Sequence, residues 1–511
     1  MKEQITQKVN DTAAETVSEI KDIVIVNDTV DDVKNDVKDQ AAILDALQQA
    51  IKQENLEAVK SIFATGVDID AVHGSTPLHW AAAYNSNAEI LKYLVSQVVS
   101  VNVRDETGST PLHWAAKNSN VEVLRFLVLQ GTSIDITDKN GTTPLHQGAR
   151  YNPNVEVLKY IISHGARIDA VDDNGDTPLH FAVRNNPNVY VIKFLVSQGA
   201  DVNAADNYGW TPLHWATRWN PKSEIIQYLI SQGADVNAVN VYGETALHWA
   251  MESGSKIEII QYLISQSAAI KADNDGWTPL HWAIIFNAPV DVLKFLAAQG
   301  ADINAVDKNG ATALHLATTR WDVNVDVLSY LISQGAFVNV RNNNGFTPLH
   351  YAAKNDLYVE VFEYLVSLGA NVNARNDDGQ TPLHFAIKRD LCADILEFLV
   401  ENGADINASD NEGWTALLLA VKSKLYFEDF EFMLSHNADI NASNIYGETP
   451  LALAKRYHYD EIANWLESKG AIINVSNKGK GNNDKLEKNI VITAGVIVLC
   501  IVIVLLHFFV F

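Results

Sequence analysis

The chain has 511 residues, of which 47% are hydrophobic and 20% are charged, so it supports a large core and is not disordered throughout. Its 38 basic and 62 acidic residues give a formal net charge of -24. This balance argues against nucleic acid as the main partner, because duplex binding depends on neutralising phosphates. With only Cys392 and Cys500, a disulfide framework and a cysteine-based zinc site are excluded.

Residues 1–40 are predicted to form an acidic leader that is partly disordered. They contain 5 Lys and 10 acidic residues, and the mixed charges from Lys2 onward leave no apolar region for a secretory signal peptide. Val30, Val33 and Val37 form a weak stripe at helical spacing, which favours one amphipathic helix in this segment.

A tetrapeptide repeats along most of the chain at intervals of 33 to 35 residues. Thr-Pro-Leu-His begins at Thr76, Thr110, Thr143, Thr177, Thr211, Thr278, Thr347 and Thr381, and Thr-Ala-Leu-His begins at Thr245 and Thr312. Degenerate copies begin at Thr415 and Thr449, and residues 42–72 read as a further unit without the motif. This periodicity indicates about 13 repeats rather than several unrelated domains.

Each repeat is predicted to contain two helices and an extended finger. Thr caps the first helix, and Pro occupies its first position, where the missing N–H costs nothing. The second helix, as in residues 155–162, is apolar at helical spacing, and its sixth residue is aromatic in all twelve motif-bearing units, which is interpreted as marking the inter-repeat core. A glycine usually ends this helix, and a finger such as residues 200–204 leads through a turn at Gly209 to the next Thr.

Some positions depart from this pattern. Val98, Ser267 and Asn437 replace the glycine that ends the second helix, so strain is expected at Val98 and Ser267, whereas Asn tolerates the left-handed conformation. Prolines in the turn between the two helices belong to a longer turn of the Asn-Pro-Asn type, as at Pro153 and Pro187. The extra residue accounts for the repeat length of 34.

With these motifs, residues 42 to about 475 resemble the ankyrin-repeat family. The resemblance implies an all-α solenoid of paired antiparallel helices with β-hairpin-like fingers, occupying residues 41–475. It also implies that the motif histidines hydrogen-bond to neighbouring turns. Because the sequence contains neither a catalytic motif nor a phosphate-binding glycine loop, we expect no enzymatic activity, no cofactor and no metal site.

The C-terminal end is predicted to anchor the chain in a membrane. Residues 476–489 form a polar linker with four lysines, and residues 490–511 contain no charged side chain. As a helix these 22 residues extend about 33 Å, against about 30 Å of hydrocarbon. The lysines before this span predict a single-pass, tail-anchored protein with its repeats on the cytoplasmic side.

Two sets of equivalent positions are expected to face the concave groove of the solenoid: the residue before each motif Thr, and the residue after the small pair in each first helix. Eight of twelve residues at the second position are basic: Lys117, Arg150, Arg184, Arg218, Lys354, Lys388, Lys422 and Arg456. They either pair with finger aspartates such as Asp105, Asp138, Asp172 and Asp206, or form a basic surface with aromatic anchors suited to an acidic peptide or helix. Lys or Arg is also common at this position across the resembled family.

These positions define the candidate partner-binding residues. They are Lys117, Arg150, Arg184, Arg218, Lys354, Trp210, Trp219, Trp277, Phe346 and Trp414. In contrast, Trp80, Trp114, Trp215, Trp249 and Trp282 directly follow the motif histidine and are expected to pack between repeats. The predicted function is that of a membrane-anchored scaffold that binds a protein through its groove. The alternative is a regulator or bacterial effector that blocks a host protein through the same surface.

Overall fold

The computed structural model describes residues 32–64, 75–84, 88–97, 100–254, 256–319, 325–355, 358–388 and 393–473. In these residues the regular structure is helical, apart from one isolated antiparallel β-bridge between Val306 and Thr312. The chain divides into two compact units. Unit 1 comprises residues Met1–Ala317 and Asn324–Phe337, and unit 2 comprises Thr318–Val323 and Val338–Phe511.

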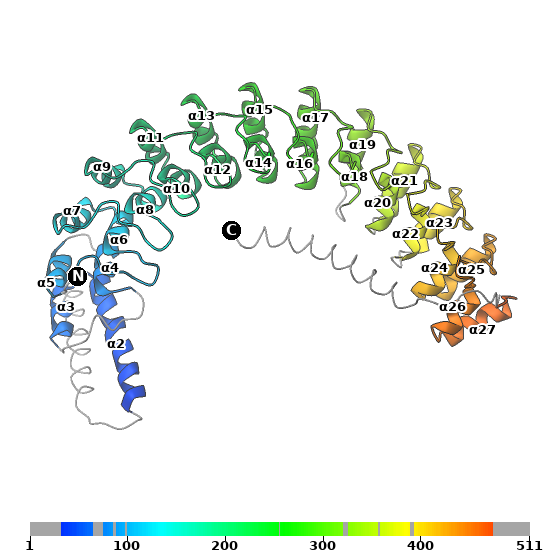
Figure 1. Cartoon of the computed structure of the whole chain (residues 1–511), viewed down its shortest axis with the longest axis horizontal. Helices are drawn as coiled ribbons and strands as arrows, with labels where there is room; N and C mark the ends of the chain where they lie inside the picture. The colour runs from blue at the N-terminus through cyan, green and yellow to red at the C-terminus, as the bar shows by residue number, and fades with distance from the viewer. Residues whose placement is uncertain are drawn as a thin grey trace, which may run out of the picture. The chain divides into compact units, whose positions relative to one another are not determined.

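Unit 1 consists of successive helix pairs, in which each even-numbered helix is the first of its repeat. Its helices are α2 (Asp32–Lys52), α3 (Leu56–Phe63), α4 (Pro77–Tyr84), α5 (Glu89–Gln97), α6 (Pro111–Lys117), α7 (Val121–Leu129), α8 (Pro144–Tyr151), α9 (Val155–Ser163), α10 (Pro178–Asn185), α11 (Val189–Ser197), α12 (Pro212–Trp219), α13 (Ser223–Ser231), α14 (Ala246–Glu252), α15 (Ile257–Ser265), α16 (Pro279–Ile285), α17 (Val290–Ala298), α18 (Ala313–Ala317) and α19 (Val325–Ser333). First helices of neighbouring repeats contact one another, so α12, α14 and α16 form one row and α13, α15 and α17 another (Figure 1). The predicted boundary after residue 40 lies inside the continuous helix α2.

Unit 2 continues the same pairing in its own helices. These are α20 (Pro348–Lys354), α21 (Val359–Ser367), α22 (Pro382–Lys388), α23 (Ala393–Glu401), α24 (Ala416–Ser423), α25 (Phe427–Ser435), α26 (Pro450–Arg456) and α27 (Asp460–Ser468). The all-α architecture of paired helices predicted from the repeats is therefore confirmed.

The repeated tetrapeptide joins each repeat to the next through its histidine. In α6, Nδ1 of His113 accepts the backbone N–H of Thr110 at 3.0 Å, and Nε2 donates to the carbonyl of Thr142 in the following repeat at 2.9 Å. The same bond to the next repeat is made by His79, His146, His180, His214, His248, His350 and His384. The predicted structural role of these histidines is confirmed. One side chain caps its own helix and ties two repeats together.

The core between repeats is aliphatic. In α7, the side chains of Val123, Leu124 and Leu127 are completely buried, as is Leu112 in α6. Phe126, the aromatic sixth residue of α7, is only half-buried. The aromatic position predicted to mark the inter-repeat core therefore lies at the edge of that core, because the third, fourth and seventh residues of the helix point more directly at the neighbouring helices.

The Asn-Pro-Asn turns add a second set of links between repeats. Asn186 is buried, and its Nδ2 donates to the carbonyls of Ala149 and Asn152 in the preceding repeat at 2.7 and 2.9 Å. Its Oδ1 accepts the backbone N–H of Asn188 at 2.9 Å. Asn152 makes the equivalent bonds one repeat earlier. The same atoms pair in these two successive repeats, so the inserted turn links each repeat to the one before it.

Finger loops are held by an acidic or amide side chain and by backbone bonds to the next finger. Oδ1 of Asp138 accepts the N–H groups of Asn140 and Thr142, both at 2.9 Å. The N–H of Val241 donates to the carbonyl of Tyr208 at 2.9 Å, and Asn274 repeats this bond to Tyr242. Neighbouring fingers are therefore fixed relative to one another within a unit.

Two of the residues that replace the glycine at the end of the second helix adopt left-handed backbone conformations. Ser267 has φ 68° and Asn437 has φ 63°, close to the φ of 90° at the equivalent Gly233. Strain is therefore expected at Ser267, whose side chain rarely adopts this conformation. Val98 lies outside the described residues.

No helix among the described residues is long and apolar enough to cross a membrane. The predicted linker at residues 476–489 and the predicted span at residues 490–511 lie outside the described part of the chain.

Candidate partner-binding face

The first helices and finger loops of unit 1 border a common surface, which we call the helix–finger face. Its residues come from the C-terminal halves of α6, α8, α10, α12 and α14 and from the finger loops that precede these helices. A recess of about 320 Å³ on this face is lined jointly by finger residues such as Asp105 and Asp138 and by helix residues such as Lys117 and Arg150. Ser75 and Ser109, which precede the motif Thr, line the same recess, so side chains of the two predicted positions are brought together on one surface.

Basic side chains on this face lie over aromatic rings. The ammonium of Lys117 lies 5.2 Å from the ring centroids of both Trp114 and Tyr151. The guanidinium of Arg150 lies 5.0 Å from the centroid of Tyr151 and 5.6 Å from that of Phe181. Such contacts are attractive because the ring face carries the negative end of the aromatic quadrupole. The aromatic residue that follows the motif histidine therefore supports a basic residue as well as packing between repeats.

Arg218 is enclosed by three aromatic rings. Its guanidinium lies 4.1 Å from the ring centroid of Trp249, 4.5 Å from Trp219 and 5.1 Å from Trp210. Its Nη2 is 3.4 Å from Oε1 of Glu252, and the side chains of Arg218 and Glu252 are only 18% and 14% exposed. Arg218 is consequently occupied by intramolecular contacts and acts mainly as a structural residue.

Arg184 is placed differently. Its guanidinium lies 4.9 Å from the ring centroid of Trp215 and 5.0 Å from that of Trp219. Within the described residues, no carboxylate lies within ion-pair distance of Arg184, and Trp219 is 40% exposed. The N–H groups of a guanidinium point outward in the plane of the group. They therefore remain able to bind a carboxylate when the face of the guanidinium stacks on a ring.

Within the described residues, Lys117, Arg150, Arg184 and Arg218 form no ion pair with the finger aspartates. Lys117, Arg150 and Arg184 have no ion pair there, and the acidic partner of Arg218 is Glu252 on α14. The finger carboxylates are instead bound by backbone N–H groups: Oδ1 of Asp172 accepts those of Asn174 and Asp176, both at 2.9 Å. The basic positions are held in place by aromatic stacking rather than by the fingers.

Tryptophan positions on the face are less exposed than the sequence suggested. Trp210 is half-buried, because its ring lies 4.4 Å from that of Trp249. Trp277 is also half-buried, and its carbonyl accepts a hydrogen bond from His248 at 3.2 Å. Of the tryptophans proposed as anchors, only Trp219 is exposed within the described residues. The predicted packing role of Trp80, Trp215, Trp249 and Trp282 is confirmed by their burial, whereas Trp114 is half-buried.

The candidate residues of unit 2 form separate contacts. Lys354 is exposed and its ammonium lies 5.3 Å from the ring centroid of Phe346, which is half-buried against Phe385. Trp414 differs from its expectation as an exposed anchor, since it is only 8% exposed. Its carbonyl accepts a hydrogen bond from His384 at 3.0 Å, and Lys422 covers its ring at 4.5 Å.

Two carboxyl groups on the helix–finger face have strongly raised pKa values. Burial, together with the nearby carboxylates of Asp172 and Asp206, raises the pKa of Asp176 to about 7, while Arg184 opposes the shift. Burial also raises the pKa of Glu244 to about 7. Oδ1 of Asp176 is buried and has no hydrogen-bond partner among the described residues. These groups change charge close to neutral pH, next to the stacked cations.

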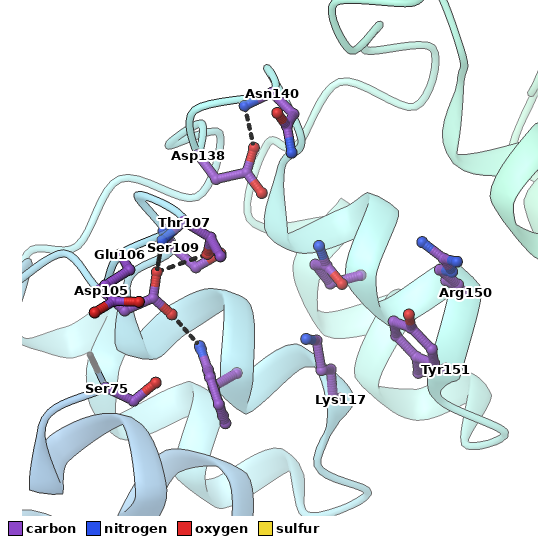
Figure 2. Close-up of a pocket in the computed structure, with 12 residues that line it drawn as sticks. Ser75, Asp105, Glu106, Thr107, Ser109, Lys117, Asp138, Asn140, Arg150 and Tyr151 are labelled. Carbon is purple, nitrogen blue, oxygen red and sulfur yellow. Dashed lines mark hydrogen bonds between the residues drawn. The ribbon is translucent and has the colours of Figure 1, made fainter. Parts of the chain in front are cut away.

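Figure 2 shows the recess at the N-terminal end of this face. Asp105 and Asp138 lie on finger loops at one side, while Lys117, Arg150 and Tyr151 project from helices at the other side (Figure 2). The recess is open because the residues before the motif Thr are small here, Ser75 and Ser109, whereas the equivalent position later in unit 1 is Trp210. These two small residues are the sequence signal for the recess, which the repeat pattern alone does not predict.

In the part of the chain that the structure describes, no cluster of side chains supports a catalytic site or a metal site. No group of three or more His, Cys, Asp and Glu side chains there could hold a metal ion. The motif histidines are buried and bound to backbone groups, so their imidazoles do not face an open site.

Comparison with protein families identifies the repeats over most of the chain. The model described as ankyrin repeats (3 copies) matches residues 25–105, 47–138, 82–172, 124–206, 145–240, 221–307, 286–376, 369–444 and 407–477. No curated protein is a detectable relative of the chain.

Proposed function

Because this chain belongs to the ankyrin-repeat family, we propose that it is a protein-interaction scaffold whose partner docks on the helix–finger face of unit 1. Ankyrin repeats imply a protein–protein interaction scaffold, and the family is typically non-catalytic. The finer proposal concerns where the partner binds and what chemistry it presents. We place the main contact at Arg184 and Trp219.

The contrast between Arg184 and Arg218 carries this proposal. Both are stacked on tryptophan, but Glu252 neutralises Arg218 inside the protein, whereas Arg184 has no carboxylate at ion-pair distance among the described residues. Trp219 lies beside both and is 40% exposed. Exposed Trp and Arg are the residue types that contribute most to binding energy at interfaces.

The partner is proposed to present a carboxylate-bearing segment to this face. Arg184 is half-buried, so burial lowers its pKa, yet guanidinium remains charged in proteins. Because two rings already fix its guanidinium, Arg184 loses little conformational entropy on binding a carboxylate. Because the guanidinium is already partly dehydrated, it also loses little hydration. An acidic peptide or helix supplies that group.

Affinity capture with the full chain tests this proposal. Wild type is compared with Arg184→Gln and with Arg125→Gln as a matched control, since Arg125 also lies over a ring, Tyr160, but on the second helix α7. At least one captured protein is expected to depend on Arg184 and not on Arg125, and added salt should weaken its capture. Identical captured proteins in identical amounts from all three baits would contradict the proposed contact.

We further propose that residues 490–511 tether this scaffold to a membrane with the repeats on the cytoplasmic side. The support is the uncharged run of 22 residues after a lysine-bearing linker. Deleting residues 490–511 should release the protein from membrane pellets while its circular dichroism and melting temperature stay the same. A truncated chain that remains in membranes after a high-salt wash contradicts the tether.

A further inference from the structure

The recess between α6, α8 and their finger loops has walls of opposite charge. Lys117 and Arg150 line the helix wall, and Asp105, Glu106 and Asp138 line the finger wall. Within the described residues none of these acidic and basic groups forms an ion pair with another. A volume of about 320 Å³ is at the lower end of ligand-sized pockets and admits one or two side chains.

The helix wall is ready to bind an anionic group. Lys117 is half-buried over Trp114 and Tyr151, and Nε of Arg150 is buried without a hydrogen-bond acceptor among the described residues. Burial lowers the pKa of Lys117, whereas Asp105 and Asp138 raise it and Arg150 lowers it further. These carboxylates therefore act on Lys117 across the recess without touching it.

The carboxylates of the finger wall differ in how many further hydrogen bonds they can accept. Asp105 is saturated, because it accepts the N–H groups of Thr107 and Ser109, the hydroxyl of Thr107 and the indole N–H of Trp114. Asp138 is less occupied: its Oδ1 accepts two backbone N–H groups, and no bond to Oδ2 is found in the described residues. Glu106 is exposed. Asp138 and Glu106 are thus the acidic groups that can bind a cation.

We propose that this recess binds a pair of oppositely charged side chains on one extended segment of the partner, with the carboxylate against Lys117 and Arg150 and the basic group against Asp138 and Glu106. Three acidic and two basic residues line it, so a purely acidic segment meets repulsion from the finger wall. Successive side chains of an extended peptide point to opposite sides. A sequence that alternates basic and acidic residues therefore serves both walls at once. The inference rests on the proposed function, and it refines the partner's charge pattern.

The structure offers substitutions that change charge without changing the turn. Asn240 occupies the position equivalent to Asp138, and its Oδ1 accepts the N–H groups of Tyr242 and Glu244 in the same way. Asp138→Asn should therefore keep the finger loop intact. Lys117→Met keeps an unbranched stem over the rings. Asp307→Asn is the matched control, because Oδ1 of Asp307 accepts the N–H groups of Asn309 and Ala311 outside the recess.

The test measures binding of three fluorescent octapeptides with blocked termini to the full chain in nonionic detergent: all-Glu, all-Lys and alternating Lys-Glu. The alternating peptide should bind about fivefold more tightly than either of the others, the scale of one partly exposed charge pair. Asp138→Asn and Lys117→Met should each remove most of that advantage. Asp138→Asn should also strengthen binding of the all-Glu peptide, and Lys117→Met that of the all-Lys peptide, whereas Asp307→Asn changes none of the affinities.

The inference is overturned if the alternating peptide has no advantage, if Asp138→Asn leaves all three affinities unchanged, or if none of the peptides binds. Arg184→Gln separates this result from the proposed function. If the all-Glu peptide binds most tightly and Arg184→Gln weakens it, the contact at Arg184 stands and the recess assignment fails. If the alternating peptide responds to Lys117→Met while Arg184→Gln leaves binding of the all-Glu peptide unchanged, the recess stands and the contact at Arg184 fails.

Discussion

The guanidinium of Arg218 lies 4.1 Å from the ring centroid of Trp249 in the next repeat. The sequence suggests a surface cation here, but the geometry describes a residue that joins two repeats. Glu252 lies 3.4 Å away and has a second oxygen, Oε2, that is buried without a hydrogen-bond partner among the described residues. Removing Arg218 therefore leaves a poorly solvated carboxylate behind.

Arg218→Gln is expected to lower the free energy of unfolding by about 2 kcal/mol, from the lost ring contacts and the uncompensated Glu252. In the double variant with Glu252→Gln, part of this loss should return, because no unpaired charge is left. Urea denaturation of the wild type, both single variants and the double variant checks the coupling. Losses that simply add would show that the two side chains do not interact.

A second stability comparison concerns two neighbours in the fifth motif-bearing repeat. Leu213 is completely buried, so Leu213→Ala should cost about 2–5 kcal/mol from lost burial and the remaining cavity. Trp210→Ala should cost about 1–2 kcal/mol, because its ring lies 4.4 Å from that of Trp249 rather than in solvent. Urea melts on the two variants give both numbers, and a loss below about 0.5 kcal/mol for Trp210→Ala would show that its ring is not packed.

The buried asparagine of the inserted turn provides a third prediction. Asn186→Ala should lower the free energy of unfolding by about 1–3 kcal/mol, because the carbonyls of Ala149 and Asn152 lose their donor in a buried place. Asn174→Ala is the control, since its side chain is exposed on a finger loop and should change stability by less than about 0.5 kcal/mol. Equal effects of the two substitutions in thermal melts would contradict the proposed link between repeats.

The buried histidines make stability depend on pH. Burial lowers the pKa of His180, His214 and His350 from 6.5 to about 4. Above pH 6.5, the pKa in the unfolded chain, these imidazoles are neutral in both the folded and the unfolded chain, so they do not affect stability there. Below it the unfolded chain binds protons that the folded chain refuses, and stability falls progressively as the pH drops toward about 4.

Asp176 and Glu244 work in the opposite direction, because their folded pKa values of about 7 lie above the unfolded values. Between the unfolded and the folded pKa, these carboxyl groups are protonated in the folded chain and ionised in the unfolded chain. Their destabilising effect is therefore largest above about pH 7, where they are ionised in both states. The melting temperature should therefore be highest at about pH 6.5–7 and decline on the acid side. Glu244→Gln should raise the melting temperature at pH 8 and leave it unchanged at pH 4. A wild-type melting temperature that rises steadily between pH 6.5 and 4.5 would contradict the histidine assignment.

Much of the fold could be predicted because each repeat carries its own local signals. Thr110, Pro111 and His113 specify a helix start by capping alone, and the 34-residue period then fixes what packs beside it. The motif histidine was expected to bond to the next repeat because the family pattern implies it, and the bond from His113 to Thr142 confirms this.

The site was harder to predict because exposure and pairing depend on three-dimensional neighbours. Trp219 and Trp414 are both tryptophans at expected surface positions, yet the first is 40% exposed and the second 8%. Likewise, Arg184 and Arg218 occupy equivalent positions, but Arg218 pairs with Glu252, the acidic residue one repeat later, and is covered by three rings, whereas Arg184 is covered by two and has no ion pair within the described residues. That signal was present in the sequence, 34 residues downstream, but its meaning required the distance between the two side chains.

Photo-crosslinking tests the central claim, that a partner contacts the helix–finger face, most directly. Benzoylphenylalanine replaces Trp219 in the full chain, and in a matched control it replaces Tyr190, which is 66% exposed on α11 and also lies beside a cation, Lys193. After irradiation in cells, we expect a specific adduct from position 219 that disappears with Arg184→Gln, and none from position 190. An adduct that forms at position 190 and not at position 219 would contradict it, because the partner would then bind the second-helix side.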